Sequence, residues 1–177
     1  MVCRALLTFL SSVDYICSKN KFSTLCDLLG DTDLVDTLNG EYEYTIFAPT
    51  DNAFDNVGDE IVNLVTKKAS TLRNLLLFHA VDDKVKFDDL YCTGLTEMAN
   101  GDDSRTVCTS DGKVHQKGGG NPRNMMPRII EYNIPTCQGY IHVIDEVLLP
   151  RQLTKEANVP SIPTPEPPMR ECYSLCK

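Results

Sequence analysis

Residues Tyr44–Phe54, YTIFAPTDNAF, decide how the rest of the chain is interpreted. The stretch opens with β-branched and aromatic residues, which favour a buried strand. Pro49 cannot donate a hydrogen bond to a sheet, so the strand is expected to end near it. Thr50 or Asp51 can then accept hydrogen bonds from the free backbone N–H groups of a following turn. The stretch therefore predicts a strand, a break and the start of a helix.

Helices are predicted on both sides of this junction. Residues 13–40 have apolar positions at helical spacing in short pieces, with Gly30 as one stop. A further helix is expected at 59–68, and Ser70 is placed to cap the next one, whose core face includes His79. Since a lone histidine on a core-facing stripe is more often buried and hydrogen-bonded than a ligand or catalyst, we interpret His79 as structural.

The second half of the chain predicts antiparallel strands. The Asp-Gly pair at 111–112 separates residues 105–109 from residues 113–117, which is a strong signal for a hairpin. Two more strands are expected at 128–134 and 140–149. Because helices come first and strands later, the sequence predicts an α+β domain.

The last of these strands places an acidic residue in an apolar setting. Alternation along it puts Asp145 on a face with aliphatic residues and His142 on the opposite face. Because an unpaired buried carboxylate is strongly destabilising, we hypothesise that Asp145 accepts hydrogen bonds from the Pro49–Asn52 turn. Such a clamp would join two distant parts of the chain. The alternative is an aspartate at a strand bulge that points to solvent.

The bulk properties indicate one acidic globular domain. The 177 residues are 42% hydrophobic, which suffices for a core. The net charge of −8 and the pI near 4.8 disfavour a nucleic-acid partner, and no apolar run approaches the about 20 residues that span a bilayer. We expect the domain at 13–150, a truncated leader or an N-terminal extension at 1–12, and a Pro-rich tail with two cysteines at 151–177.

Eight cysteines favour an oxidised, secreted protein over a cytosolic one with reduced thiols. The sequence signal for a zinc site is weak, because no Cys-x-x-Cys pair is present. Cys17 and Cys26 would bridge two helical pieces, and Cys92 and Cys108 would staple a β-rich excursion, although Cys137 could take one of these partners instead. Two cysteines of the tail could pair with each other, with another chain or with Cys3: Cys172 and Cys176.

Two blocks of the sequence resemble the fasciclin-like domain family. That family carries a TxFAPTxxAF block and a GxIHVIDxVLLP block, which correspond here to Thr45–Phe54 and Gly139–Pro150. Between them the family has a Leu-rich helix ending in Tyr-His, and this chain has Leu75–His79. The resemblance implies a wedge or sandwich of β-strands with several helices packed against it. It also implies an extracellular or cell-surface adhesion role, usually without catalysis.

The chain departs from the family pattern at two places. Phe78 stands where the family has the Tyr of Tyr-His, and Asn133-Ile134 stands where it has Asp-Ile. Both places are linked in animal relatives of the family to integrin recognition, so these three residues are candidate ligand contacts. Because position 133 lacks a carboxylate that could meet a receptor's metal ion, the resemblance does not extend to integrin binding.

The predicted function is a non-catalytic module that binds extracellular-matrix or cell-surface proteins and needs no cofactor. A second hypothesis is that a basic belt around the glycine-rich loop at 118–122, which we expect to be mobile, binds an acidic polysaccharide. A Cys/His hydrolase is a weaker hypothesis, because no cysteine lies in a recognisable nucleophile context. The residues of the basic belt, within 113–128, are Lys113, Lys117, Arg123 and Arg128.

Overall fold

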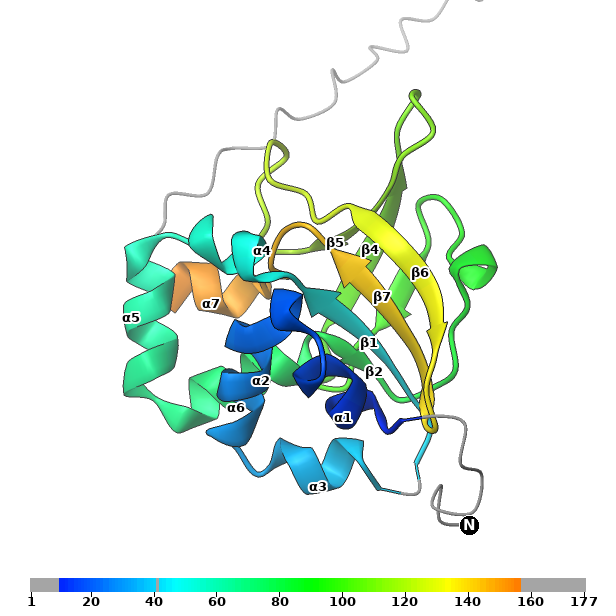
Figure 1. Cartoon of the computed structure of the whole chain (residues 1–177). Helices are drawn as coiled ribbons and strands as arrows, with labels where there is room; N and C mark the ends of the chain where they lie inside the picture. The colour runs from blue at the N-terminus through cyan, green and yellow to red at the C-terminus, as the bar shows by residue number, and fades with distance from the viewer. Residues whose placement is uncertain (1–9, 41, 157–177) are drawn as a thin grey trace, which may run out of the picture.

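The computed structural model describes residues 10–40 and 42–156, in which short helices precede two β-sheets (Figure 1). Before the first strand lie α1 (Ser12–Cys17), η2 (Asn20–Phe22), α2 (Ser23–Gly30) and α3 (Leu34–Leu38). The other helices are α4 (Asp51–Asp55), α5 (Asp59–Lys67), α6 (Ala69–Leu77), η3 (Phe87–Asp89) and α7 (Arg151–Glu156). The predicted α+β class is confirmed.

The strands form a four-stranded sheet in the order β2-β1-β7-β6 and a three-stranded sheet in the order β3-β4-β5. Their bounds are β1 (Tyr44–Pro49), β2 (Ala80–Val81), β3 (Leu95–Glu97), β4 (Asp103–Cys108), β5 (Val114–Gly118), β6 (Ile129–Pro135) and β7 (Gly139–Ile144). The two central strands, β1 and β7, run parallel, and their neighbours run antiparallel to them. Strands from the early and the late parts of the domain thus meet in one sheet.

The two central strands of the four-stranded sheet, β1 and β7, are buried on both faces. Side chains of β1 and β7 alternate between two hydrophobic clusters, as the two-residue period of a strand requires. Ile46 and Ile141 join the larger cluster, which packs against the helices. Phe47 and Ile144 join a smaller cluster on the other face, together with Phe78. Figure 1 shows the helices gathered on one side of this sheet and the β4–β5 hairpin on the other.

The predicted hairpin is confirmed, whereas two other element boundaries were predicted wrongly. Gly112 lies between β4 and β5 with a φ of 79°, which a glycine adopts without strain. Helix α6 begins at Ala69 after Lys68, so Ser70 lies inside the helix and does not cap it. Strand β7 ends at Ile144 rather than at residue 149, because the chain bends there toward α7.

The packed domain is wider than residues 13–150. Ser12 is fully buried, and its hydroxyl forms a hydrogen bond with that of Thr136. Leu153 of α7 is 3% exposed and belongs to the larger hydrophobic cluster. Residues 151–156 therefore belong to the packed domain. Residues 1–9 of the leader or extension predicted at 1–12, and residues 157–177 of the tail, lie outside the described residues.

Both predicted local disulfides are confirmed. Cys17–Cys26 joins α1 to α2, and Cys92–Cys108 joins the segment before β3 to the end of β4. Cys137, which was considered as an alternative partner, is also disulfide-bonded. The other cysteines lie outside the described residues: Cys3, Cys172 and Cys176.

Candidate functional site

The two sequence blocks lie side by side, as the junction at Tyr44–Phe54 led us to expect. Their strands pair from Tyr44 opposite Gly139 to Pro49 opposite Ile144. Just beyond the strand, the Thr50 N–H donates to the carbonyl oxygen of Ile144 at 3.2 Å. The blocks are therefore joined by a parallel ladder and its extension, all of it backbone hydrogen bonding.

Asp51 stabilises a different helix from the one that was predicted. Thr50 precedes α4 without a side-chain capping bond. The Asp51 carboxylate accepts hydrogen bonds from the Ser23 hydroxyl at 2.6 Å and the Thr24 N–H at 2.8 Å. Burial works against ionisation, but these hydrogen bonds outweigh it and lower the pKa of Asp51. Asp51 thus fixes the start of α2 against the junction.

The hypothesis of an Asp145 clamp on the Pro49–Asn52 turn is wrong. Asp145 Oδ1 accepts from the Arg128 N–H at 2.8 Å, and Oδ2 accepts from Arg128 Nε at 3.0 Å. Because β7 ends at Ile144, the alternation that placed Asp145 on an apolar face does not reach it. The Asp145 side chain is 34% exposed, and the ion pair with Arg128 compensates its negative charge. Asp145 therefore does not require hydrogen bonds from a buried helix N-terminus.

His79 is a core residue, as predicted. It is 3% exposed, its Nδ1 donates to the Leu75 carbonyl at 2.8 Å, and its Nε2 accepts from the Leu148 N–H at 3.0 Å. Burial lowers the pKa of His79 to about 4, although the bond to Leu75 acts in the opposite direction. The neutral ring therefore ties the end of α6 to the second sequence block.

His142 has a similar structural role within the four-stranded sheet. Its side chain is fully buried on β7, where Nε2 donates to the Val85 carbonyl at 3.0 Å. Its Nδ1 accepts from the Asn133 N–H at 3.3 Å, and its ring lies 5.4 Å from that of Phe47. Burial lowers the pKa of His142, so this ring is also neutral near pH 7.

Asn121 is a central residue that sequence reasoning missed. The 118–122 loop was expected to be mobile, but Asn121 is 4% exposed. Its Oδ1 accepts from the N–H groups of Gly118 at 3.1 Å and Leu149 at 2.9 Å, and its Nδ2 donates to the Val147 carbonyl at 2.8 Å. The signal was available, since Asn after a glycine run favours a turn closed by its own side chain.

The candidate ligand contacts drawn from the family pattern are largely engaged inside the domain. Phe78 is fully buried in the smaller cluster and offers no surface to a ligand. Asn133 adopts a φ of 56°, which asparagine tolerates, at an irregularity in β6, and its Oδ1 accepts from the Phe87 N–H at 2.8 Å. Ile134 packs against the larger cluster. Asn133 thus positions neighbouring residues within the fold.

Next to these residues lies an exposed apolar surface, which we call the aromatic surface: Ile130 and Tyr132 of β6 and Phe87 of η3. Ile130 is 40% exposed and Tyr132 53%. The Tyr132 and Phe87 rings stack with centroids 4.1 Å apart and planes tilted by 17°. Since Asn133 holds the Phe87 backbone, the stack is fixed in place.

The predicted basic belt is divided by the structure. Lys113 pairs with Asp111, and Arg128 pairs with Asp145. The hydrogen bond from Lys113 is the main reason that the pKa of Asp111 is lowered. Lys117, by contrast, lies within electrostatic reach of Arg123. The belt is therefore two ion pairs and a separate pair of like charges.

Comparison with known proteins identifies the fold. A family model described as the fasciclin domain matches residues 20–150. The chain belongs to this family. The resemblance inferred from the two sequence blocks is thereby confirmed.

Relatives of this fasciclin domain include bacterial proteins. The uncharacterized protein sll1735 of Synechocystis is 30% identical over 137 residues, covering 77% of this chain and 96% of that protein. The cell surface glycolipoprotein MPB83 of Mycobacterium bovis is 28% identical over 120 residues, covering 68% of this chain and 49% of that protein. The structure of a FAS1 domain pair from the insect cell adhesion molecule Fasciclin I matches with a TM-score of 0.59 at 22% identity, covering 72% of this chain and 45% of that one, and has the same fold.

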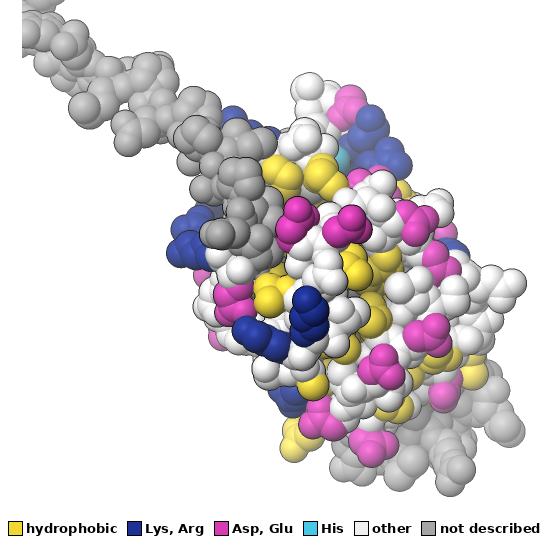
Figure 2. All heavy atoms as spheres, turned by 90° about the vertical axis from the view of Figure 1, so that its left-hand side faces the viewer, with side chains coloured by type: hydrophobic (Ala, Val, Ile, Leu, Met, Phe, Trp, Pro, Cys, Tyr) yellow, Lys and Arg dark blue, Asp and Glu magenta, His cyan; other side chains and the backbone are white. Residues whose placement is uncertain are grey.

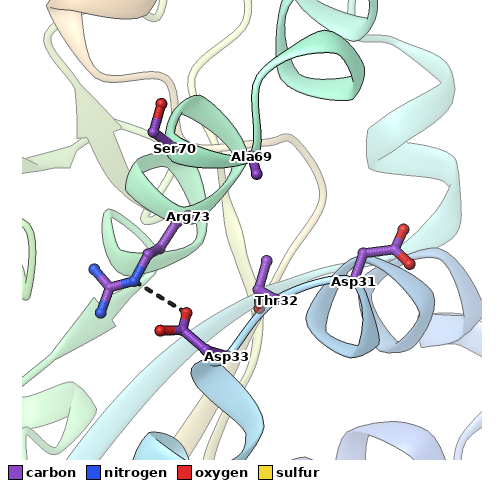
Figure 3. Close-up of a pocket in the computed structure, with 6 residues that line it drawn as sticks. All are labelled: Asp31, Thr32, Asp33, Ala69, Ser70 and Arg73. Atoms are coloured by element: carbon purple, nitrogen blue, oxygen red, sulfur yellow. Dashed lines mark hydrogen bonds and ion pairs between the residues drawn. The ribbon is translucent and has the colours of Figure 1, made fainter.

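The fasciclin domain has a shallow hollow where α6 begins (Figure 3). Its volume is about 210 Å³, below the range of about 300–1,000 Å³ that small-molecule sites occupy. Arg73 of α6 crosses toward the turn before α3, and its Nε donates to Asp33 at 3.1 Å. The ion pair thus engages two of the three charged side chains that line the hollow.

The chemistry available in this fasciclin domain is limited within the described residues. Every cysteine in that part of the chain is disulfide-bonded, so none of them supplies a thiolate nucleophile. The same residues contain no group of three or more His, Cys, Asp and Glu side chains arranged to hold a metal ion. None of the described helices has the length and apolar character that crossing a membrane requires.

One face of the fasciclin domain is predominantly acidic. Figure 2 shows the side that carries α5, where Asp and Glu side chains are spread across the surface with hydrophobic side chains visible between them. Val62 of α5 is 41% exposed there. This distribution agrees with the net charge of −8.

Proposed function

We propose that this chain is a non-catalytic adhesion module that binds matrix or cell-surface proteins outside the cell. The observation that carries the proposal is the aromatic surface, where Ile130 and Tyr132 are exposed and Tyr132 stacks on the partly buried Phe87, while the candidate ligand contacts of the family pattern are largely engaged inside the domain. Family membership supports it, since one relative is named a cell surface glycolipoprotein and a structural neighbour is a cell adhesion molecule.

The aromatic surface has the properties of a protein-binding hot spot. Tyrosine and other aromatic side chains are enriched at such positions, because they bury a large area at a small cost in conformational entropy. Tyr132 is stacked on Phe87, and Asn133 holds the Phe87 backbone. A partner therefore meets side chains that are already ordered, which lowers the entropic cost of association.

The extracellular location is supported by the oxidised cysteines. Two disulfides lie within the described residues, Cys17–Cys26 and Cys92–Cys108, and Cys137 is bonded as well. Disulfides persist in oxidising compartments and are rare in the cytosol. A module that meets matrix partners works in that environment.

The test is capture of partners from an extracellular extract by the immobilised, oxidised protein. Tyr132→Ser removes the centre of the aromatic surface, and Tyr42→Ser, at a residue that is 75% exposed elsewhere, is the matched control. We expect the same captured proteins with the wild type and with Tyr42→Ser, and a loss of at least about tenfold with Tyr132→Ser, since hot-spot truncations cost about 2 kcal/mol or more. Equal capture by all three proteins would refute this surface as the binding site.

A further inference from the structure

Four basic side chains from separate parts of the chain gather beside the β4–β5 hairpin; we call them the basic cluster: Arg105, Lys117, Arg123 and Arg151. Arg105 and Lys117 are directly opposite each other in the β4–β5 pair, so their side chains leave the same face of the sheet. Burial lowers the pKa of Lys117, and the charges of Arg123, Arg151 and Arg105 lower it further. All three guanidinium groups are therefore within electrostatic reach of one ammonium group.

The cluster stands on a fixed framework. Asn121 holds the loop after β5 to the segment that leads into α7 through its bonds to Gly118 and Leu149. At Gly119 the loop passes so close to α7 that an added Cβ would lie 3.2 Å from the Cβ of Arg151 (Figure 1). The hairpin, the loop and α7 are thus locked together, and their basic side chains cannot spread apart by movement of the backbone.

The members of the basic cluster lack acidic partners within the described residues, unlike several of the other basic residues of the domain. Lys21, Lys84 and Lys113 each form an ion pair with a carboxylate. Within residues 10–40 and 42–156 no ion pair involves a member of the cluster. Like charges directly opposite each other on two strands are destabilising. Arg105 and Lys117 therefore keep a repulsive pairing in a chain whose net charge is −8.

The extent of the cluster is set by acidic residues further along the same sheet. Glu97 and Asp103 are opposite each other in the β3–β4 pair. Asp103 lies two residues before Arg105 on β4 and therefore on the same face of the sheet. The positive surface therefore runs from Arg105 across β5 and the loop toward α7, and not along the whole three-stranded sheet. The three arginines of the cluster are exposed, so the cluster suits a ligand that presents several anionic groups in a row.

We infer that the basic cluster binds a linear, sulfated polysaccharide of the extracellular space. The planar guanidinium group of arginine donates paired N–H groups to two oxygens of one sulfate or carboxylate group, and three of the four members are arginines. The choice of a polysaccharide rests on the proposed extracellular function, because nucleic acid and cytoplasmic lipid surfaces belong to other compartments. The site differs from the predicted belt, since Arg105 and Arg151 take the places of the ion-paired Lys113 and Arg128.

The test measures binding of the oxidised protein to heparin across a salt series. The site variant Arg105→Gln/Arg123→Gln/Arg151→Gln keeps Lys117, which is partly buried. The control variant Lys21→Gln/Lys84→Gln/Lys113→Gln removes the same number of positive charges from exposed ion pairs. Both variants are compared with the wild type by circular dichroism, so that only folded proteins enter the binding series.

We expect the site variant to bind at least about tenfold more weakly and to show a shallower dependence of log K on log salt, by about one for each arginine that no longer meets an anionic group. The control variant should keep the wild-type slope. Equal weakening of both variants, or no heparin binding by the wild type, would overturn the inference. Binding to phosphatidylserine vesicles with none to heparin would overturn it in favour of a membrane surface. Because capture of extracellular proteins through Tyr132 is measured separately, its survival alongside a negative heparin result would leave the proposed function standing.

Discussion

His79→Leu removes a buried ring that links α6 to the second sequence block. The substitution leaves the Leu148 N–H and the Leu75 carbonyl oxygen without their partner. A buried polar group left unsatisfied costs about 1–3 kcal/mol. At pH 7, where the ring is neutral, we therefore expect the free energy of unfolding to fall by about 3 kcal/mol in the variant.

The same substitution should be much less harmful in acid. The pKa of His79 is about 4 in the folded state against 6.5 in an unfolded chain, so the unfolded state binds the proton more readily between these values. The wild type is thus fully stabilised above pH 6.5 and loses stability as the pH falls toward 4, by about 3 kcal/mol at pH 4. The leucine variant has no such loss at this site, so the gap between the two proteins should nearly close.

The assay is urea unfolding of the oxidised wild type and variant at pH 7 and at several values down to pH 4. His142 titrates in the same direction in both proteins and cancels from their difference. Leu34→Ala is the control, because it opens the core at a fully buried position of α3 without removing a titratable group. A gap for His79→Leu that stays constant with pH, as expected for the control, would refute the assignment of a buried neutral ring.

Three further predictions concern the joints of the domain. Asn121→Ala should lower the free energy of unfolding by about 3 kcal/mol in urea unfolding, because buried backbone groups lose their partner; a loss below about 0.5 kcal/mol would mean that the loop is not anchored. Replacing both Cys92 and Cys108 by Ala should lower the free energy of unfolding by about 3 kcal/mol, as expected for a closed loop of this length, and an unchanged thermal midpoint would contradict it. Asp51→Ala should lower the free energy of unfolding by about 1 kcal/mol, and Asp51→Asn should lower it less, since the amide keeps one acceptor. Equal losses of stability for the two variants in thermal unfolding would show that the charge of Asp51 decides the contact.

Local chemistry made much of the fold predictable. The Asp-Gly turn at 111–112 needs only two residues in the right backbone conformation, and the pairs Cys17–Cys26 and Cys92–Cys108 are close in sequence. The buried strand β1 likewise follows from its own β-branched and aromatic side chains. The pairing of β1 with β7 was a different matter. The Asp145 hypothesis placed the two blocks together through the wrong contact, and their parallel pairing was not predicted, because nothing within either strand specifies it.

The errors arose where a distant partner decides the role of a residue. Asp145 was assigned to the wrong turn because its partner, Arg128, could not be identified from alternation alone. The loop around Asn121 was expected to be mobile because its anchors at 147–149 come much later in the chain. The basic belt was predicted from residues that are close in sequence. In the fold, Lys113 and Arg128 pair with carboxylates, and Arg105 and Arg151 lie near Lys117 instead.

Attachment of cells to a surface coated with the oxidised domain tests the central claim, adhesion through a folded surface, most directly. Cells of the producing organism should attach to the wild type above an albumin-coated control and much less to Tyr132→Ser, while Tyr42→Ser should match the wild type. Attachment no greater than to albumin, with the coated domain shown to be folded, would contradict the account.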